Sequence, residues 1–177
     1  MSAGRLVIVA LLLTALAMAV SMYWLQVYAY YDELSPDEAG PVTLVRTGGE
    51  GGEAIPASDL RAIDSESSPI RYRACFTTSE PLDTLAQRFE AYDEPKPLNA
   101  PGWFNCYDAE AIGAALESGE GRAFLSAKDI RYGIDRVVAV LPDGRGFAWQ
   151  QINACGEVVF NGEPAPEGCP PVPESLK

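Results

Sequence analysis

The feature that most constrains this chain is an uncharged run of 26 residues, Leu6 to Tyr31, which lies between Arg5 and Asp32. A helix needs roughly 20 apolar residues to cross the hydrocarbon core of a bilayer, because each residue advances the chain by about 1.5 Å. Inside lipid every backbone N–H and C=O must be paired within the segment, so a spanning segment is helical. The sequence therefore predicts a transmembrane helix over residues 6–31, with residues 1–5 on one side of the membrane.

A cleaved signal peptide is the alternative reading of the same run. Ala17-Met18-Ala19 forms an A-x-A cleavage pattern, which would leave a mature chain that starts at Val20. However, tyrosine and tryptophan continue from Tyr23 to Tyr31, and such rings favour the lipid headgroup level of a spanning helix. We therefore expect an uncleaved anchor, and cleavage after Ala19 stays open.

The orientation follows from the basic residues. Only Lys and Arg count in the positive-inside rule, and Arg5 lies before the apolar run, whereas no basic residue follows it until Arg46. Residues 1–5 are therefore expected in the cytoplasm and the bulk of the chain outside it. A signal peptide would deliver the chain to the same side.

The cysteines give an independent indication of the compartment. The chain has four, and all follow the apolar run: Cys75, Cys106, Cys155 and Cys169. Four cysteines allow three pairings, and sequence does not choose among them; we expect the nearest pairs, 75 with 106 and 155 with 169, because they close the shortest loops. The gaps are too wide for the paired ligands of a structural zinc site or for a C-x-x-C redox motif. Structural disulfides, with no metal and no cofactor, are the expectation, and free thiols are the alternative.

Composition excludes several classes of function. The chain has no histidine, which removes Ser-His-Asp and Cys-His nucleophile pairs and histidine-ligated metals. Its formal net charge is −12, which argues against a nucleic-acid partner because nucleic-acid phosphates would be repelled.

Residues 32–58 are acidic and rich in Gly and Pro, and we expect a connector that lets the domain stand away from the membrane. Residues 59–163 are expected to form one domain, and residues 164–177 a Pro-rich tail held by Cys169.

Within the domain, hydrophobic spacing predicts alternating strands and helices. The predicted helices are residues 82–89, capped by Ser79, and residues 109–118, capped by Asp108. The predicted strands are residues 70–77, 123–125, 136–141, 146–152 and 157–160. Pro142-Asp143-Gly144 favours a hairpin turn between two of them. The fold class is therefore α+β: two helices packed on one face of an antiparallel sheet, after an N-terminal transmembrane helix.

Four residues are candidate ligand or partner contacts. Arg71 and Arg73 fall on one face of the strand predicted at 70–77, where they could bind a carboxylate or phosphate, although pairing with surface acids is the ordinary alternative. Trp103 and Phe104 could form a docking patch, with a place in the core as the alternative.

Catalytic carboxylates are the remaining site class. The acids considered are Asp64, Glu66, Asp93, Glu94 and Asp135. A pair of them would need a shared cleft, and nothing in their spacing indicates one. We therefore expect no catalytic site and no enzyme activity.

Four segments carry a resemblance to a known family: residues 23–31, 67–76, 100–106 and 132–146. The chain resembles a bacterial family of single-pass, membrane-anchored envelope proteins whose domain has no assigned activity. The resemblance implies an anchored, exported domain and carries over no catalytic residue.

Taken together, the sequence predicts a bacterial inner-membrane protein with its domain in the periplasm, which acts as an accessory or protein-interaction module. The expected partners are the lipid bilayer and a membrane or periplasmic protein. A small-ligand binding or sensor domain is the alternative, and a carboxylate-based hydrolase is a distant third.

Overall fold

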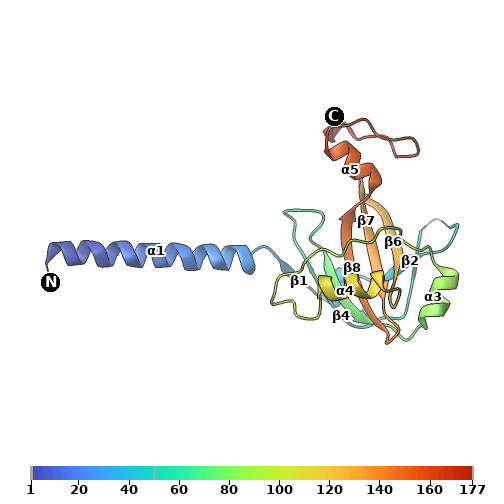
Figure 1. Cartoon of the computed structure of the whole chain (residues 1–177), viewed down its shortest axis with the longest axis horizontal. Helices are drawn as coiled ribbons and strands as arrows, with labels where there is room; N and C mark the ends of the chain where they lie inside the picture. The colour runs from blue at the N-terminus through green and yellow to red at the C-terminus, as the bar shows by residue number, and fades with distance from the viewer. Residues whose placement is uncertain (1, 50, 177) are drawn as a thin grey trace.

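The computed structural model describes residues 2–49 and 51–176 and shows a long helix that projects from a folded body (Figure 1). The helix, α1, spans Ala3–Val27, and it is long and apolar enough to cross a membrane. At about 1.5 Å per residue its 25 residues extend roughly 37 Å. It starts three residues before the predicted span 6–31 and ends four residues before the end of that span, where residues 28–30 form a turn. Of the predicted cytoplasmic segment 1–5, residue 1 lies outside the described residues.

The body is built on one six-stranded antiparallel sheet in the order β1-β4-β5-β8-β7-β6. The strands are β1 (Asp32–Leu34), β4 (Ser58–Asp64), β5 (Arg73–Thr77), β6 (Arg122–Arg131), β7 (Ile134–Val140) and β8 (Arg145–Ile152). The predicted hairpin at Pro142-Asp143-Gly144 joins β7 to β8, and Gly144 has the positive φ that its turn requires. The α+β class is confirmed.

Each face of the sheet is covered by a different helix. Helix α3 (Leu82–Arg88) buries Leu85 against Ala74 and Val138 on one face, in the α3-side core. Helix α4 (Ala109–Glu117) buries Ile112 on the other face, in the α4-side core.

The prediction that both helices share one face is therefore wrong. Strand β7 shows why: Val137 and Ala139 belong to the α4-side core, whereas Val138 and Val140 belong to the α3-side core. A strand that is apolar on both faces must be covered on both faces.

The predicted connector is largely folded. Helix α2 (Pro36–Ala39) begins with a capping box between Ser35 and Glu38. Strand β2 (Thr43–Val45) pairs with β3 (Gly52–Ala54). Leu44 is fully buried in the α3-side core. Val42 and Leu44 belong to the α3-side core, so this segment is part of the folded body. The prediction of a connector over residues 32–58 is therefore wrong. The link between α1 and the sheet is the four-residue segment 28–31.

The predicted caps differ in outcome. Asp108 caps α4, since its carboxylate accepts hydrogen bonds from the backbone N–H groups of Glu110 and Ala111 at 3.0 and 3.1 Å. Ser79 does not cap α3, whose N-cap is Pro81 and makes no side-chain bond.

The strand predicted at residues 157–160 is a helix, α5 (Ala154–Phe160). Asn153 nucleates it, because its side-chain oxygen accepts a hydrogen bond from the backbone N–H of Gly156 at 3.0 Å. The tail continues to a short 3₁₀ turn at Glu174–Leu176. Residue 177 lies outside the described residues.

Candidate functional site

Helix α1 contacts the body through a cluster that we call the joint: Val27, Tyr28, Tyr30, Tyr31, Arg71 and Trp103. The indole N–H of Trp103 donates a hydrogen bond to the backbone carbonyl of Val27 at 2.7 Å. This carbonyl is one of the last four of the helix, which have no partner within it. The ring of Trp103 also stacks on Tyr28 with the centroids 6.4 Å apart. A side chain of the body thus completes the C-terminus of α1.

Arg71 extends the joint from the other side. Its guanidinium carbon lies 5.2 Å from the ring centroid of Tyr30 and 5.4 Å from that of Tyr31, which is cation–π distance. Tyr31 in turn meets Trp103 edge to face, with the centroids 6.4 Å apart. Two of the four candidate residues, Arg71 and Trp103, are therefore brought together by the tyrosines that follow the helix.

Arg73, in contrast, points into the protein and is only 3% exposed. Its guanidinium donates hydrogen bonds to the backbone carbonyls of Leu98 at 2.7 Å and Asn99 at 3.1 Å, and to two carbonyls just before it in the chain. Burial lowers the pKa of Arg73 below its usual value. The residue fastens the loop before α4 to β5, so this arginine does not share a surface with Arg71.

Phe104 is also interior, with 1% of its surface exposed, and it lies in the α4-side core. The Arg61 guanidinium lies 5.3 Å from its ring centroid. Phe104 fills the core beneath Trp103, and the predicted patch divides into one joint residue and one core residue.

The disulfides pair as predicted. Cys75–Cys106 joins β5 to the loop that carries Trp103, and Cys155–Cys169 joins α5 to the C-terminal tail. Each disulfide therefore fixes a segment outside the sheet: the Trp103 loop in the first case and the C-terminal tail in the second.

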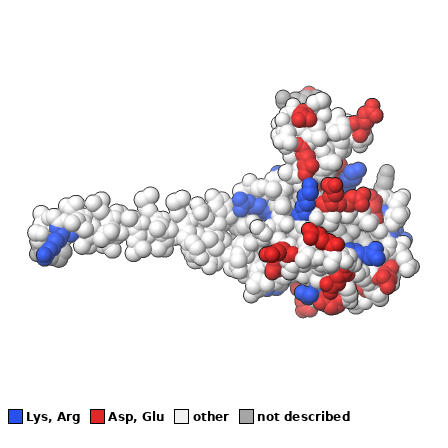
Figure 2. Space-filling model, viewed as in Figure 1, with Lys and Arg blue, Asp and Glu red and all other residues white. Residues whose placement is uncertain are grey.

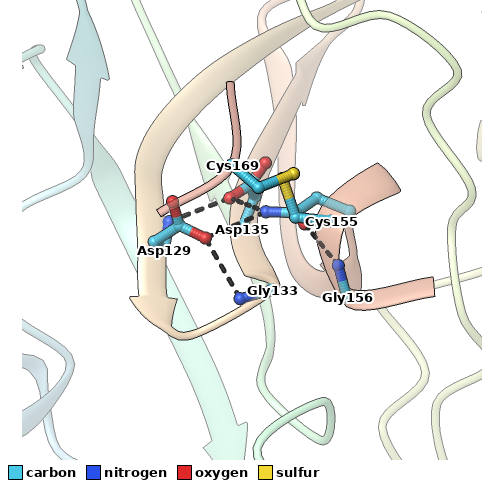
Figure 3. Close-up of a disulfide and its surroundings, with 7 residues drawn as sticks. Asp129, Gly133, Asp135, Cys155, Gly156 and Cys169 are labelled. Atoms are coloured by element: carbon cyan, nitrogen blue, oxygen red, sulfur yellow. Dashed lines mark hydrogen bonds between the residues drawn. A yellow bond between two sulfur atoms is a disulfide. The ribbon is translucent and has the colours of Figure 1, made fainter. Parts of the chain in front are cut away.

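Beneath the second disulfide lies a carboxylate network that sequence reasoning missed (Figure 3). One amide nitrogen, Nδ2 of Asn153, donates to Asp129 at 3.1 Å and to Asp135 at 2.9 Å. Asp129 also accepts from the backbone N–H of Gly133 at 3.1 Å. We call Asp129, Asp135 and Asn153 the clasp, because they tie the β6–β7 turn to the start of α5.

The clasp is tightened by two glycines. A Cβ on Gly156 would lie 2.3 Å from the Gly133 carbonyl oxygen, so only glycine permits this approach of α5 to the turn. Asp129 itself adopts a positive φ of 46°, which a non-glycine residue rarely adopts. Asp129 and Asp135 accept hydrogen bonds from backbone and amide N–H groups, and Asp135 also accepts one from the Tyr92 hydroxyl at 3.1 Å, so both carboxylates serve a structural role.

The other acids named as candidate catalytic carboxylates line two separate hollows. Asp93 and Glu94 line a cleft of about 460 Å³ with Asp135, whereas Asp64 and Glu66 line a pocket of about 590 Å³ elsewhere. Within residues 2–49 and 51–176, no group of three or more acids, cysteines or histidines is arranged to hold a metal ion.

The 590 Å³ hollow, which we call the polar pocket, also contains Arg131 and Arg136. The Nε of Arg136 is buried and has no hydrogen-bond partner among the described residues. Burial raises the pKa of Asp64 above its usual value, against the lowering effect of its hydrogen bond from the Ser65 N–H and of Arg136. Sequence reasoning did not select the two arginines, and no spacing pattern marks them.

Next to the polar pocket is an open, largely apolar hollow of about 460 Å³. The two share Ser68, Pro69 and Arg131. We call this second hollow the apolar groove, and its apolar walls are Pro69, Ile70, Tyr132, Ile134, Ile152, Phe160, Pro173 and Leu176. The tail supplies one wall, so the Cys155–Cys169 staple also shapes the groove.

Comparison with known proteins adds one finding. The model of a family described as a family of unknown function (DUF6446) matches residues 42–170. The chain belongs to this family. No curated protein and no solved structure matches it.

The family match covers most of the features above. It begins at Val42, within the segment predicted as a connector, and it includes Arg71, Trp103, the clasp and all four cysteines. Helix α1 and the joint tyrosines lie before it. An apolar N-terminal helix and two disulfides indicate a protein that is membrane-anchored or secreted.

Proposed function

We propose that this protein is a single-pass component of a bacterial inner membrane, with its N-terminus in the cytoplasm and its domain in the periplasm. In this proposal the domain is a non-catalytic accessory module that binds a membrane or periplasmic protein through the apolar groove. Arg5, in the first turn of α1, and the disulfides that follow the helix support the topology.

The observation that carries the interaction role is the exposure of large apolar side chains at this groove. Phe160 and Leu176 are 42% and 44% exposed, and Ile130, beside the groove in the polar pocket, is 36% exposed. Outside α1 and the joint, these are the large apolar side chains that the described residues leave exposed. Contiguous exposed apolar surface is typical of protein-interaction sites.

The joint fixes the position of the apolar groove relative to helix α1. Ile70 lines the groove and Arg71, the next residue, rests on the joint tyrosines. Because the link between α1 and β1 is four residues long, the domain is held close to the membrane and the groove with it. A partner in or near the same membrane would therefore meet the groove in one orientation.

Site-specific photocrosslinking in native membranes tests the proposal. A crosslinker at Phe160, in the groove, is expected to give a discrete adduct with a membrane or periplasmic protein. The matched control is the exposed Gln87 on α3, which Figure 1 shows on a different side of the body from α5. Equal labelling at the two positions, or none at Phe160, would overturn the interaction role.

The topology has a separate test. Protease added to cells with a permeabilised outer membrane is expected to digest the domain, and protection would place it in the cytoplasm. N-terminal sequencing decides between anchor and signal peptide, because a mature chain that starts at Val20 would mean cleavage.

The alternative of small-ligand binding now centres on the polar pocket instead of Arg71 and Arg73. The observation that favours it is that two arginines, Arg131 and Arg136, line this pocket, since guanidinium groups bind carboxylate and phosphate ligands. The test is a screen of small anions by thermal shift, in which Arg136→Gln removes the response and Arg122→Gln does not.

A further inference from the structure

Arg71 is a cation held at the level where the anchor helix ends. Helix α1 ends at Val27, and the joint tyrosines that follow it are of the residue type that gathers at the lipid headgroups. Two of them, Tyr30 and Tyr31, lie within 5.4 Å of the Arg71 guanidinium. In an inserted chain, the charge of Arg71 therefore lies at the membrane surface.

This charge has no carboxylate partner among the described residues, where the ion pairs involve other arginines and a lysine. The rings of Tyr30 and Tyr31 lie at cation–π distance from the guanidinium, and its side-chain N–H groups make no hydrogen bond within the described residues. Free N–H donors of an arginine can bind phosphate oxygens as a planar fork. Figure 2 shows basic side chains where the helix meets the body, on a surface that otherwise carries many acids.

We propose that Arg71, supported by Tyr30 and Tyr31, binds the phosphate of a zwitterionic phospholipid in the surrounding leaflet. The proposal rests on the membrane anchoring in the proposed function and adds a lipid ligand to the joint. Bound in this way, the headgroup fixes the body against the bilayer at a second point besides α1.

The charges around Arg71 select a zwitterionic headgroup over an anionic one. Asp32 directly follows Tyr31 and lines the polar pocket, where four carboxylates outnumber the two arginines: Asp32, Glu38, Asp64 and Glu66 against Arg131 and Arg136. These carboxylates attract the ammonium group of such a lipid. The chain as a whole carries a formal charge of −12, so an anionic leaflet repels the body.

Thermal unfolding of the full chain in detergent micelles, with lipid titrated in, tests the proposal. The probes are a phosphatidylethanolamine, a phosphatidylglycerol and inorganic phosphate. We expect the phosphatidylethanolamine to raise the midpoint temperature at the lowest concentration, because a ligand that binds the folded state stabilises it. Arg71→Gln is expected to shift the half-saturating concentration by up to about fivefold, which corresponds to the loss of one exposed ion pair of about 1 kcal/mol. The exposed Arg122, on β6, provides the control R122Q, which is expected to respond like the unaltered chain.

Each outcome decides a part of the proposal. Equal responses of the unaltered chain and R71Q would overturn it. A stronger response to phosphatidylglycerol would refute the zwitterionic headgroup, and an equal response to inorganic phosphate would refute the lipid source. If R71Q does not fold, Arg71→Lys keeps the charge without the planar fork and is expected to bind more weakly than the unaltered chain; unchanged binding by R71K would overturn the proposal.

Flotation of liposomes that carry the full chain separates this proposal from the one on which it rests. R71Q is expected to float with the lipid as the unaltered chain does, because α1 alone holds it there. If neither floats, the membrane anchoring fails; if both float and respond alike to lipid, the phosphate site alone fails.

Discussion

Replacement of Arg73 by glutamine tests the reasoning that this residue fastens the domain instead of binding a ligand. Its bonds to the carbonyls of Leu98 and Asn99 join β5 to the loop that leads to Trp103. A hydrogen bond to a charged group contributes about 1.5–3 kcal/mol, so the two together contribute about 3–6 kcal/mol. Burial of the charged guanidinium, which also lowers the pKa of Arg73, costs free energy, and this cost is subtracted from the contribution of the two hydrogen bonds. We therefore expect R73Q to lower the free energy of unfolding by about 3 kcal/mol.

The assay is guanidinium chloride unfolding of the full chain in detergent micelles, followed by tryptophan fluorescence. Trp149 is fully buried in the α4-side core and reports the unfolding of the domain. For a chain of this size about 3 kcal/mol also corresponds to a fall of about 6–12 °C in the midpoint temperature. An unchanged slope with denaturant would show that stability, and not the extent of unfolding, has changed.

Two controls sharpen the result. Arg73→Lys keeps the charge but not the planar fork, so its loss is expected to lie between that of R73Q and zero. The exposed Arg122→Gln is expected to change stability by no more than about 0.5 kcal/mol. If R73Q unfolds at the same denaturant concentration as the unaltered chain but loses binding of a partner, Arg73 is a contact residue and the reasoning here is refuted.

Three further predictions concern the joint, the second staple and the polar pocket. Trp103→Phe keeps an aromatic ring but removes the indole N–H that donates to the Val27 carbonyl. Hydrogen exchange of the surrounding loop is expected to rise, and no change would mean that the bond does not hold the loop. Removal of the Cys155–Cys169 pair by double alanine replacement opens a loop of about 15 residues and is expected to cost about 3 kcal/mol in denaturant unfolding, on the chain-entropy account; a cost under 1 kcal/mol would contradict it. Asp64→Asn is expected to stabilise the chain at pH 7, because the raised pKa of Asp64 means that its charged form is disfavoured in the folded state. That gain should shrink as the pH falls through the folded pKa and vanish below about 3.8, the ordinary value, where both states are protonated; a gain independent of pH would exclude the carboxylate charge as its cause.

Local signals in the sequence predicted the elements whose cause is local. The Asp108 cap, the hairpin at Pro142-Asp143-Gly144 and the apolar helix near the N-terminus each depend on a few neighbouring residues, and all three are present. The nearest-pair disulfides also follow from chain distance. These features could be predicted because little else in the fold competes with them.

The errors arose where a distant segment decides the local structure. Residues 157–160 have the β-branched composition of a strand, but the cap from Asn153 and the close contact between Gly133 and Gly156 make them helical. Residues 42–45 fall in the segment predicted as a connector because of its Gly and Pro content, whereas Val42 and Leu44 are buried in the α3-side core and residues 43–45 form β2. The uninterrupted apolar run at residues 137–141 is typical of a strand buried on both faces, and it is the sequence signal for a helix on each face.

The candidate site was the hardest part to predict, because its residues converge only in the folded state. Arg71 and Arg73 are two residues apart and would share a face of a regular strand, yet β5 begins only at Arg73. Arg71 therefore lies before the strand and turns to the joint, whereas Arg73 turns inward. The clasp joins three residues from the β6–β7 region and the start of α5, and no sequence spacing relates them.

The two disulfides secure the segments on which the proposed role depends and that the sheet does not hold. Cys106 fixes to β5 the loop whose Trp103 completes the end of α1, and Cys169 fixes the tail that forms one wall of the apolar groove. In both cases the stapled segment lacks the ladder of hydrogen bonds that stabilises a strand. Reduction is therefore expected to leave the sheet intact and to loosen the joint loop, which Arg73 and Phe104 also hold, and the groove wall. Disulfides persist in oxidising compartments, so the placement of these cysteines fits the topology proposed for α1.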